Sequence, residues 1–180
     1  VMEMRRQSDM GARRARDVII EAYRDFNAKF GRGGEPFIER YRMEDAEVAL
    51  VGMGTLAMPV KVAVRKMREQ GKKVGFVRVR WFRPFPTIEL QDALAGVQAV
   101  GVIDRDYSFG STFFSGVLAN ELRSALYPAV HRPTIVSFIA GLGGRELSTN
   151  NVIEITGKVF AAASGGDIDY RDTHWIGVRE

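Results

Sequence analysis

Two carboxylates separated by one residue are the strongest candidates for acid–base chemistry in this chain. Asp104 and Asp106 stand in the stretch DRDYSFGS (104–111), directly after an apolar run. A general acid or base needs a partner within hydrogen-bonding distance, and the sequence alone shows none. Because the two carboxylates flank Arg105, an ion pair within the loop is the favoured interpretation, and proton transfer is the alternative.

Two glycine-containing stretches could hold an anion. GLGGRELS (141–148) could direct backbone N–H groups and the start of a helix at a phosphate or carboxylate, with Arg145 as its partner. The alternative is a glycine turn followed by a helix cap, with Arg145 paired to a nearby carboxylate or another subunit. GMGT (52–55) resembles the start of a dinucleotide-binding fingerprint. Its third glycine is missing, which favours a tight turn between a strand and a helix.

The stretch RWFRPFPT (80–87) carries arginines and aromatic residues but no nucleophile or base of its own. Prolines fix the backbone angle φ and disfavour helix at the residue before them, so Arg83 and Phe85 should be held extended between a strand and a helix. Aromatic residues and arginine are enriched at protein interfaces. The stretch therefore predicts a docking loop. The possible interface or anion contacts are Arg83, Phe85, Arg105 and Arg145.

The composition excludes several kinds of chemistry within this chain. The sequence has no cysteine, which rules out disulfides, thiolate catalysis and cysteine-ligated zinc or iron–sulfur clusters. Its two histidines, His131 and His174, lack ligand spacing, so no metal site is predicted. The net charge of +4 comes without a basic stripe interleaved with aromatic residues, so no nucleic-acid partner is expected. No apolar run approaches the ~20 residues of a membrane helix and no signal-peptide core is present, which predicts a cytoplasmic location without membrane contact.

The elements that must position these loops follow a regular alternation. Hydrophobic residues make up 46% of the chain, enough for a sizeable core. Apolar runs near 47–54, 74–80, 98–106 and 134–144 are typical of buried strands, and each is followed by a helical pattern, with candidate caps at Thr55, Thr87 and Ser148. This alternation predicts an α/β three-layer sandwich with a mainly parallel sheet. In such sheets ligands bind beyond the carboxyl ends of the strands, where these loops lie.

Two further segments flank the predicted α/β domain, which spans residues 44–163. Residues 1–43 are predicted to form a helix and a connecting arm, and residues 164–180 an extended tail. Four aromatic residues in these segments either wrap a partner or pack on their own domain: Phe37, Tyr41, Tyr170 and Trp175. Val1 in place of Met suggests a fragment or a processed chain.

The loops, taken in this order, resemble one family. The pieces DAEVALVGMGTLA, GKKVGFVRVRWFRPFP, GVIDRDYSFGS and FIAGLGGRELS are similar to the C-terminal domain of the alpha subunit of pyruvate:ferredoxin oxidoreductase and related 2-oxoacid:ferredoxin oxidoreductases. That domain is in turn similar to the transketolase C-terminal domain. The family commonly has Asp where Glu146 stands here. The resemblance covers roughly residues 44–161, and the arginine-rich first helix resembles the connector from the pyrimidine-binding domain.

The resemblance implies a holoenzyme that oxidatively decarboxylates a 2-oxoacid, most commonly pyruvate. It implies thiamine diphosphate with Mg²⁺, [4Fe-4S] clusters and coenzyme A as co-substrate, with ferredoxin as electron acceptor. It also implies thiamine-binding, iron–sulfur and gamma subunits as partners. Since the family's thiamine-binding and substrate-binding residues lie mostly in other domains, this chain is expected to serve structure and assembly, with no catalytic residue and no bound cofactor of its own. The alternatives are a free-standing module that binds coenzyme A or another anion, and the equivalent domain of another thiamine enzyme, against which the DRDYSFGS loop argues.

Overall fold

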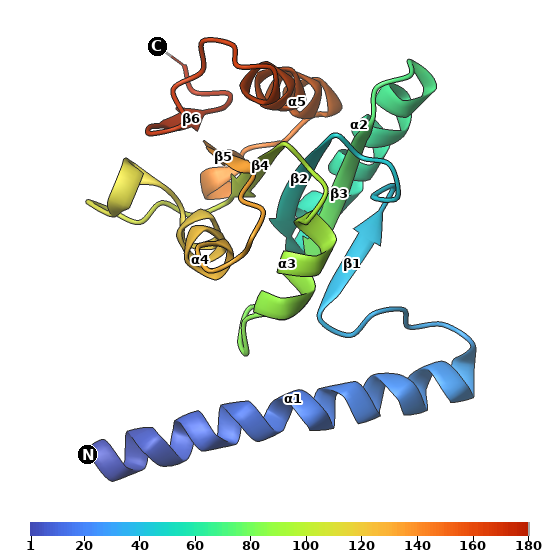
Figure 1. Ribbon diagram of the computed structural model, residues 1–180, viewed down its shortest axis with the longest axis vertical. Helices are drawn as coiled ribbons and strands as arrows, with labels where there is room; N and C mark the ends of the chain where they lie inside the picture. The colour runs from blue at the N-terminus through green and yellow to red at the C-terminus, as the bar shows by residue number, and fades with distance from the viewer. Residues whose placement is uncertain (180) are drawn as a thin grey trace.

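A six-stranded sheet forms the centre of the chain (Figure 1). The computed structural model describes residues 1–179. The strands are β1 (Ile38–Tyr41), β2 (Val48–Met53), β3 (Val74–Val79), β4 (Ala99–Asp104), β5 (Thr134–Ile139) and β6 (Thr173–Trp175). They lie in the order β1-β3-β2-β4-β5-β6, and every neighbouring pair is parallel except β1 with β3. The four predicted strands are β2 to β5, and the mainly parallel sheet confirms the predicted fold class.

Helices cover both faces of the sheet and complete the predicted three layers. Their bounds are α1 (Met2–Phe30), α2 (Ala57–Glu69), α3 (Thr87–Leu94), α4 (Val117–Leu126) and α5 (Thr149–Ala163), with short 3-10 turns η1 (Gly54–Leu56), η2 (Thr112–Phe114) and η3 (Leu142–Gly144). Helices α2 and α5 pack together on one face, and α3 and α4 pack together on the other (Figure 1).

The central strands are apolar along their length because both of their faces are covered. Successive side chains of a strand point to opposite faces, so each strand feeds two apolar clusters. Leu50 packs into the cluster that includes α2 and α5, while its neighbour Val51 packs into the cluster that includes α3 and α4. All six residues of β4 are buried, including Asp104 at its end.

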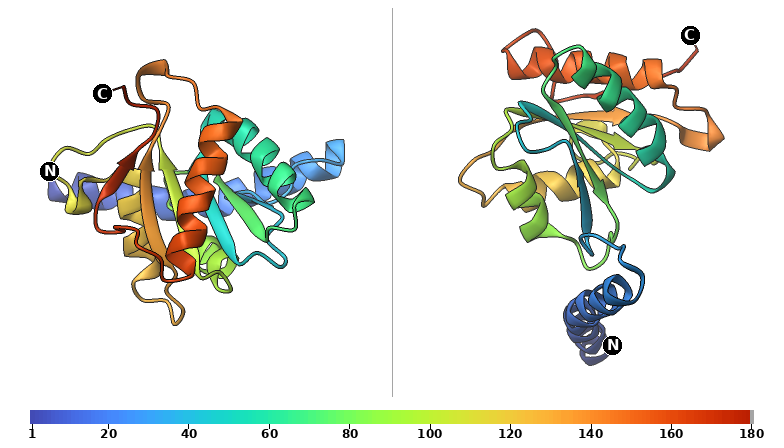
Figure 2. Two further views of the ribbon diagram at one scale, coloured as in Figure 1. Left: turned by 90° about the horizontal axis from the view of Figure 1, so that it is seen from above. Right: turned by 90° about the vertical axis from the view of Figure 1, so that its right-hand side faces the viewer.

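The N-terminal helix lies apart from these layers, as two views show (Figures 1 and 2). Ile19 is its one buried residue, and an ion pair from Arg16 to Glu89 links it to α3. The segment after α1 is more than an arm, because it forms β1, with Phe37 and Ile38 buried in the core. Among residues 1–179, no helix combines the length and apolar character needed to cross a membrane.

The tail likewise adds an edge strand, β6, which pairs with the last half of β5. The Trp175 ring of β6 contacts the Tyr107 ring in a tilted arrangement, with 5.1 Å between the ring centres. This aromatic therefore packs on its own domain while nearly half of its surface stays exposed. The predicted cap at Ser148 is confirmed: its hydroxyl accepts the Asn151 N–H of α5. Thr55 and Thr87 do not cap, because α2 and α3 begin after Leu56 and Pro86 without a side-chain cap.

Candidate functional site

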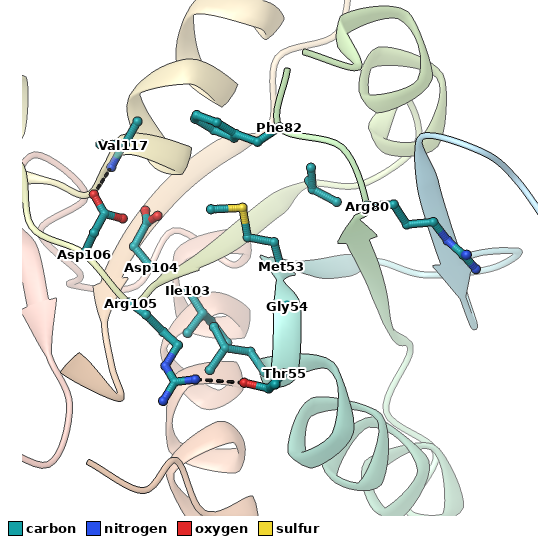
Figure 3. A pocket seen from close by; sticks show the side chains of 12 residues that line it. Met53, Gly54, Thr55, Arg80, Phe82, Ile103, Asp104, Arg105, Asp106 and Val117 are labelled. Carbon is teal, nitrogen blue, oxygen red and sulfur yellow. Dashed lines mark hydrogen bonds between the residues drawn. The ribbon is translucent and has the colours of Figure 1, made fainter. Parts of the chain in front are cut away.

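A hollow lies beyond the carboxyl ends of β2, β3 and β4 (Figure 3). Strand order reverses here, since β3 lies on one side of β2 and β4 on the other. Ligands of open α/β sheets bind at this point, and the volume of about 700 Å³ falls within the range of small-molecule sites. The lining residues are Met53, Gly54, Thr55, Leu56, Val79, Arg80, Phe82, Ile103, Asp104, Arg105, Asp106 and Val117.

The two candidate carboxylates in this hollow cap helix α4. Asp104 accepts the backbone N–H groups of Leu118 and Ala119 at 3.1 and 3.0 Å, one on each carboxyl oxygen. Asp106 accepts the Val117 N–H at 3.0 Å (Figure 3). The first three N–H groups of α4 have no partner within the helix, so these bonds satisfy all of them. No local pattern in the sequence indicated this role, because the end of a strand supplies the cap of a helix that begins well beyond it in the chain.

Burial makes the Asp104 carboxyl an unusually weak acid. Its carboxyl is almost closed to solvent, with the residue 1% exposed. Burial, a side-chain hydrogen bond with Asp106 and the charge of Asp106 together raise the pKa of Asp104 to about 7, and the Ala119 and Leu118 N–H groups partly oppose the rise. A perturbed carboxyl in a cleft is a candidate for proton transfer. Here both oxygens already accept backbone hydrogen bonds, so the arrangement supports a structural role.

Gly116, just before α4, leaves room for this buried carboxyl. A Cβ atom at residue 116 would lie 2.3 Å from both Cβ and Cγ of Asp104. Real Cβ atoms essentially never approach so closely, and the Asp104 Cβ is fixed to the backbone. Any residue other than glycine would therefore displace either the end of β4 or the start of α4. The sequence offered a glycine before a helix, but nothing that linked it to Asp104.

The expected ion pair within the DRDYSFGS loop is wrong. Arg105 Nη1 donates to Thr55 Oγ1 at 2.8 Å, and Arg105 Nε donates to the Gly141 carbonyl at 3.3 Å. Neither Asp104 nor Asp106 pairs with it within the described residues 1–179 (Figure 3). The chain bends after β4, and Arg105 points away from the two carboxylates on either side of it (Figure 3). Its guanidinium instead joins three loops at this end of the sheet.

The Arg-Pro-Phe-Pro loop lies between β3 and α3, as predicted. Arg83 forms an ion pair with Glu121 of α4, and its guanidinium lies 4.2 Å from the centre of the Phe82 ring. Phe85 meets Phe82 edge to face at 5.7 Å and packs against the α3–α4 cluster. The loop therefore braces α3 against α4, and Arg83 keeps an exposed side chain. Whether Arg83 and Phe85 also contact a partner stays a prediction.

The GLGGRELS loop borders a second hollow of about 400 Å³ together with the tail. Arg145 donates to the carbonyl of Gly177, which ties the loop to the tail after β6. The start of α5 is already capped by Ser148. The alternative interpretation, a glycine turn followed by a helix cap, describes this geometry. Arg145 bonds a backbone carbonyl instead of the expected carboxylate. The GMGT stretch is likewise a tight turn, in which Gly54 has a φ of 67°.

The side chains described do not supply ligand groups for the metals that the resemblance implies. A [4Fe-4S] cluster needs thiolate ligands, and the chain has no cysteine. Within residues 1–179, no group of three or more His, Cys, Asp or Glu side chains is placed to hold a metal ion such as the Mg²⁺ of thiamine diphosphate. The carboxylates nearest to such a role, Asp104 and Asp106, are engaged with α4.

Comparison with known families tests the resemblance found in the loops. The family model for pyruvate:ferredoxin oxidoreductase core domain II matches residues 46–152, more than half of the chain. The chain belongs to this family. The match covers the four loops and most of the α/β domain, and it confirms the family predicted from those loops.

Similar curated proteins agree with the family. The chain is 38% identical to ketoisovalerate oxidoreductase subunit VorA of Pyrococcus abyssi over 165 residues, which cover 92% of this chain and 41% of that protein. It is 36% identical to pyruvate synthase subunit PorA of Thermotoga maritima over 178 residues, which cover 99% of this chain and 43% of that protein. The chain thus spans about two-fifths of the length of the curated relatives it matches.

Solved structures agree with the fold. A 2-oxoglutarate:ferredoxin oxidoreductase from Magnetococcus marinus, with 2-oxoglutarate, coenzyme A and succinyl-CoA bound, aligns with a TM-score of 0.54 and 17% identity over 69% of this chain and 20% of that one. A split-gene transketolase in an inactive beta4 tetramer aligns with a TM-score of 0.50 and 16% identity over 67% of this chain and 40% of that one. At such identities the likeness concerns architecture alone, and it confirms the predicted transketolase-like fold.

Proposed function

We propose that this chain is the transketolase C-terminal-like domain in the alpha subunit of a cytoplasmic, thiamine-diphosphate-dependent 2-oxoacid:ferredoxin oxidoreductase. In that enzyme it serves structure and subunit assembly. Membership of the family supports the reaction class, as do the similar subunits of a ketoisovalerate oxidoreductase and a pyruvate synthase. The complete enzyme oxidatively decarboxylates a 2-oxoacid, for which pyruvate is the first candidate, and passes the electrons to ferredoxin.

One observation supports an assembly role over chemistry in this chain: its loop side chains are engaged in holding loops together. Asp104 and Asp106 cap α4, Arg105 links Thr55 to Gly141, and Arg145 binds a backbone carbonyl. Catalysis by a nucleophile and a base needs two such groups that are free to meet a substrate. Groups already committed to backbone hydrogen bonds position structure.

The cofactors belong, in this proposal, to other parts of the enzyme. Thiamine diphosphate with Mg²⁺ and the [4Fe-4S] clusters sit in the thiamine-binding and iron–sulfur parts, and the gamma subunit completes the complex. Coenzyme A acts as co-substrate, and it is bound in the solved 2-oxoglutarate:ferredoxin oxidoreductase that shares this fold. Arg83, Phe85, Arg105 and Arg145 remain the proposed contacts with these other parts.

The test is reconstitution of activity. The chain is purified alone and also as part of the complete alpha subunit in complex with the partner subunits. Both preparations are assayed for pyruvate-dependent and 2-ketoisovalerate-dependent reduction of ferredoxin in the presence of thiamine diphosphate, Mg²⁺ and coenzyme A. We expect activity in the complex and none in the chain alone. Turnover by the chain alone, or failure to purify with any subunit of such an enzyme, would overturn the proposal. Calorimetry with coenzyme A distinguishes the alternative of a free-standing module, which predicts heat of binding to the chain alone.

A further inference from the structure

A groove on the far edge of the sheet carries two arginines that form no ion pair within residues 1–179. It has a volume of about 360 Å³ and lies between the later half of α4, the start of β5 and the tail. Strand β6, the outermost strand on this side (Figure 2), pairs with Ser137–Ile139 only. The groove is lined by Phe113, Arg123, Leu126, Tyr127, Arg132, Pro133, Thr134, Ile135 and Tyr170.

Two arginines give the groove a positive charge, and no acidic residue lines it. Several other arginines of this fold are paired with carboxylates, as Arg83 is with Glu121. Neither Arg123 nor Arg132 forms an ion pair within the described part of the chain, residues 1–179, and Arg132 Nε donates only to the Ala129 carbonyl, at 3.2 Å. Among the described residues, no carboxylate forms an ion pair with either arginine of this groove, although the charge of Asp104 acts on Arg123.

One guanidinium nitrogen of Arg123 is buried without a hydrogen-bond acceptor within residues 1–179. Nη1 of this residue donates to Ser115 Oγ at 3.0 Å, and Nη2 is the buried nitrogen without an acceptor. Burial lowers the pKa of the Arg123 guanidinium, and the charge of Asp104 partly opposes this effect. A buried N–H without an acceptor is destabilising, and a carboxylate oxygen is the acceptor that a guanidinium binds best.

Aromatic rings form the remaining wall. The Phe113 ring lies 4.9 Å from the Arg123 guanidinium, and the Tyr127 ring lies 5.1 Å from that of Arg132. Phe113 has a φ of 59°, a left-handed conformation that is rare for a bulky residue, and its carbonyl accepts the Thr173 hydroxyl at 3.1 Å. Strained residues of this kind gather at binding sites, where the surroundings hold them in place.

We propose that this groove binds an extended, acidic segment of another subunit of the oxidoreductase. Carboxylates of the segment meet Arg123 and Arg132, and its apolar side chains rest on the tyrosines that line the groove. Its backbone runs beside Thr134 and Ile135, which have no strand partner on the tail side of β5 within residues 1–179. An open strand edge and alternating side-chain contacts suit an extended peptide. This inference rests on the proposed function, since it names the surface through which assembly occurs.

The experiment uses the complex of this chain with its partner subunits. A photo-cross-linking benzoylphenylalanine replaces Tyr127, which is exposed at the rim, and the cross-linked peptide is identified by mass spectrometry. In parallel, the affinity of the chain for its partners is measured for Arg132→Glu, for Arg132→Lys and for Arg65→Glu, the last an exposed arginine of α2 on the opposite face.

We expect the cross-link to reach a segment of another subunit that contains Asp or Glu. Arg132→Glu should weaken association by at least ~10-fold, while Arg132→Lys and Arg65→Glu change it by less than ~3-fold. Three results would overturn the groove proposal: a cross-link to a second copy of this chain, a cross-link to a segment without carboxylates, or equal affinities of Arg132→Glu and Arg65→Glu. If the complex is still active in any of these cases, the proposed assembly function stands. If no complex forms with the unmodified chain, both proposals fail.

Discussion

The pH dependence of folding should reveal the state of the buried carboxyl at the start of α4. Asp104 accepts two backbone N–H groups, which favour its charged form, but it is also buried beside Asp106, which favours its neutral form. The second influence dominates, with a pKa of about 7 against an ordinary value of 3.8. We therefore expect the wild-type protein to become less stable as the pH rises, and Asp104→Asn to lack this loss.

The magnitude follows from proton linkage. Between pH 5 and pH 8 the folded protein gives up the Asp104 proton, whereas the unfolded chain, with an ordinary carboxyl pKa, has already lost it. The folded state thus binds more protons, so its stability falls with rising pH. A pKa near 7 in the folded state corresponds to a fall of roughly 2–3 kcal/mol over this interval. The Asp104→Asn variant has an uncharged side chain throughout this pH range, so it removes the titration of Asp104.

The assay is urea unfolding of both proteins at pH 5, 6.5 and 8 and constant ionic strength, followed by circular dichroism. Other titrating groups are common to both proteins and cancel in the difference between their free energies of unfolding. That difference should shift by roughly 2–3 kcal/mol in favour of the variant as the pH rises. Asp106→Asn serves as the matched control: it removes the neighbouring charge, so the titration of Asp104 should move to lower pH.

The reasoning is refuted if the wild type gains stability relative to Asp104→Asn with rising pH. That result would mean that the N–H groups and dipole of α4 outweigh burial and hold the pKa of Asp104 below its ordinary value. A difference that stays constant with pH would also refute it, because the carboxyl would then keep one charge state throughout.

Two further changes test how this end of the sheet and α5 are held. Gly116→Ala places a Cβ atom 2.3 Å from Asp104 and should lower the free energy of unfolding, measured with a chemical denaturant, by about 1–3 kcal/mol. The control Gly96→Ala, whose added Cβ has nothing within 4 Å, should change it by no more than about 0.5 kcal/mol. Equal effects of the two substitutions would contradict the close approach. Ser148→Ala removes the cap of α5 and should lower the free energy of unfolding by about 1 kcal/mol. The control Ser164→Ala, at the exposed far end of the helix, should lower it by about 0.5 kcal/mol or less. A smaller loss for Ser148→Ala than for the control would show that Asn151 alone holds the helix start.

The features that could be predicted from the sequence depend on local pattern. Strands β2 to β5 are mostly apolar because both faces of the sheet are covered, and that pattern is visible without knowing the partners. The cap at Ser148 also depends only on residues three positions apart. The four possible contact residues were found in loops at the correct end of the sheet, although the structure does not test their role in binding.

Other features depend on where distant residues meet. β1 is recognisable only from its pairing with β3, which follows much later in the chain, and β6 has three residues, too few for a periodic pattern. Asp104 and Gly116 acquire their roles because the end of β4 faces the start of α4. The ion pair predicted for Arg105 failed for a related reason, since its guanidinium instead bonds Thr55 and Gly141, which lie in other loops.

Substitutions in the hollow at the strand ends and in the groove beside β5 should affect different properties, the first stability and the second association. At the carboxyl ends of β2 and β4, where such folds usually bind ligands, Asp104, Asp106 and Arg105 already have internal partners. Substitutions there should change the free energy of unfolding of the isolated chain. In the groove, Arg132 forms no ion pair within residues 1–179, so its removal should leave unfolding nearly unchanged and act on partner binding. An assembly role for the groove predicts this division, because a charge without a carboxylate partner in its own chain can pair with one from another subunit.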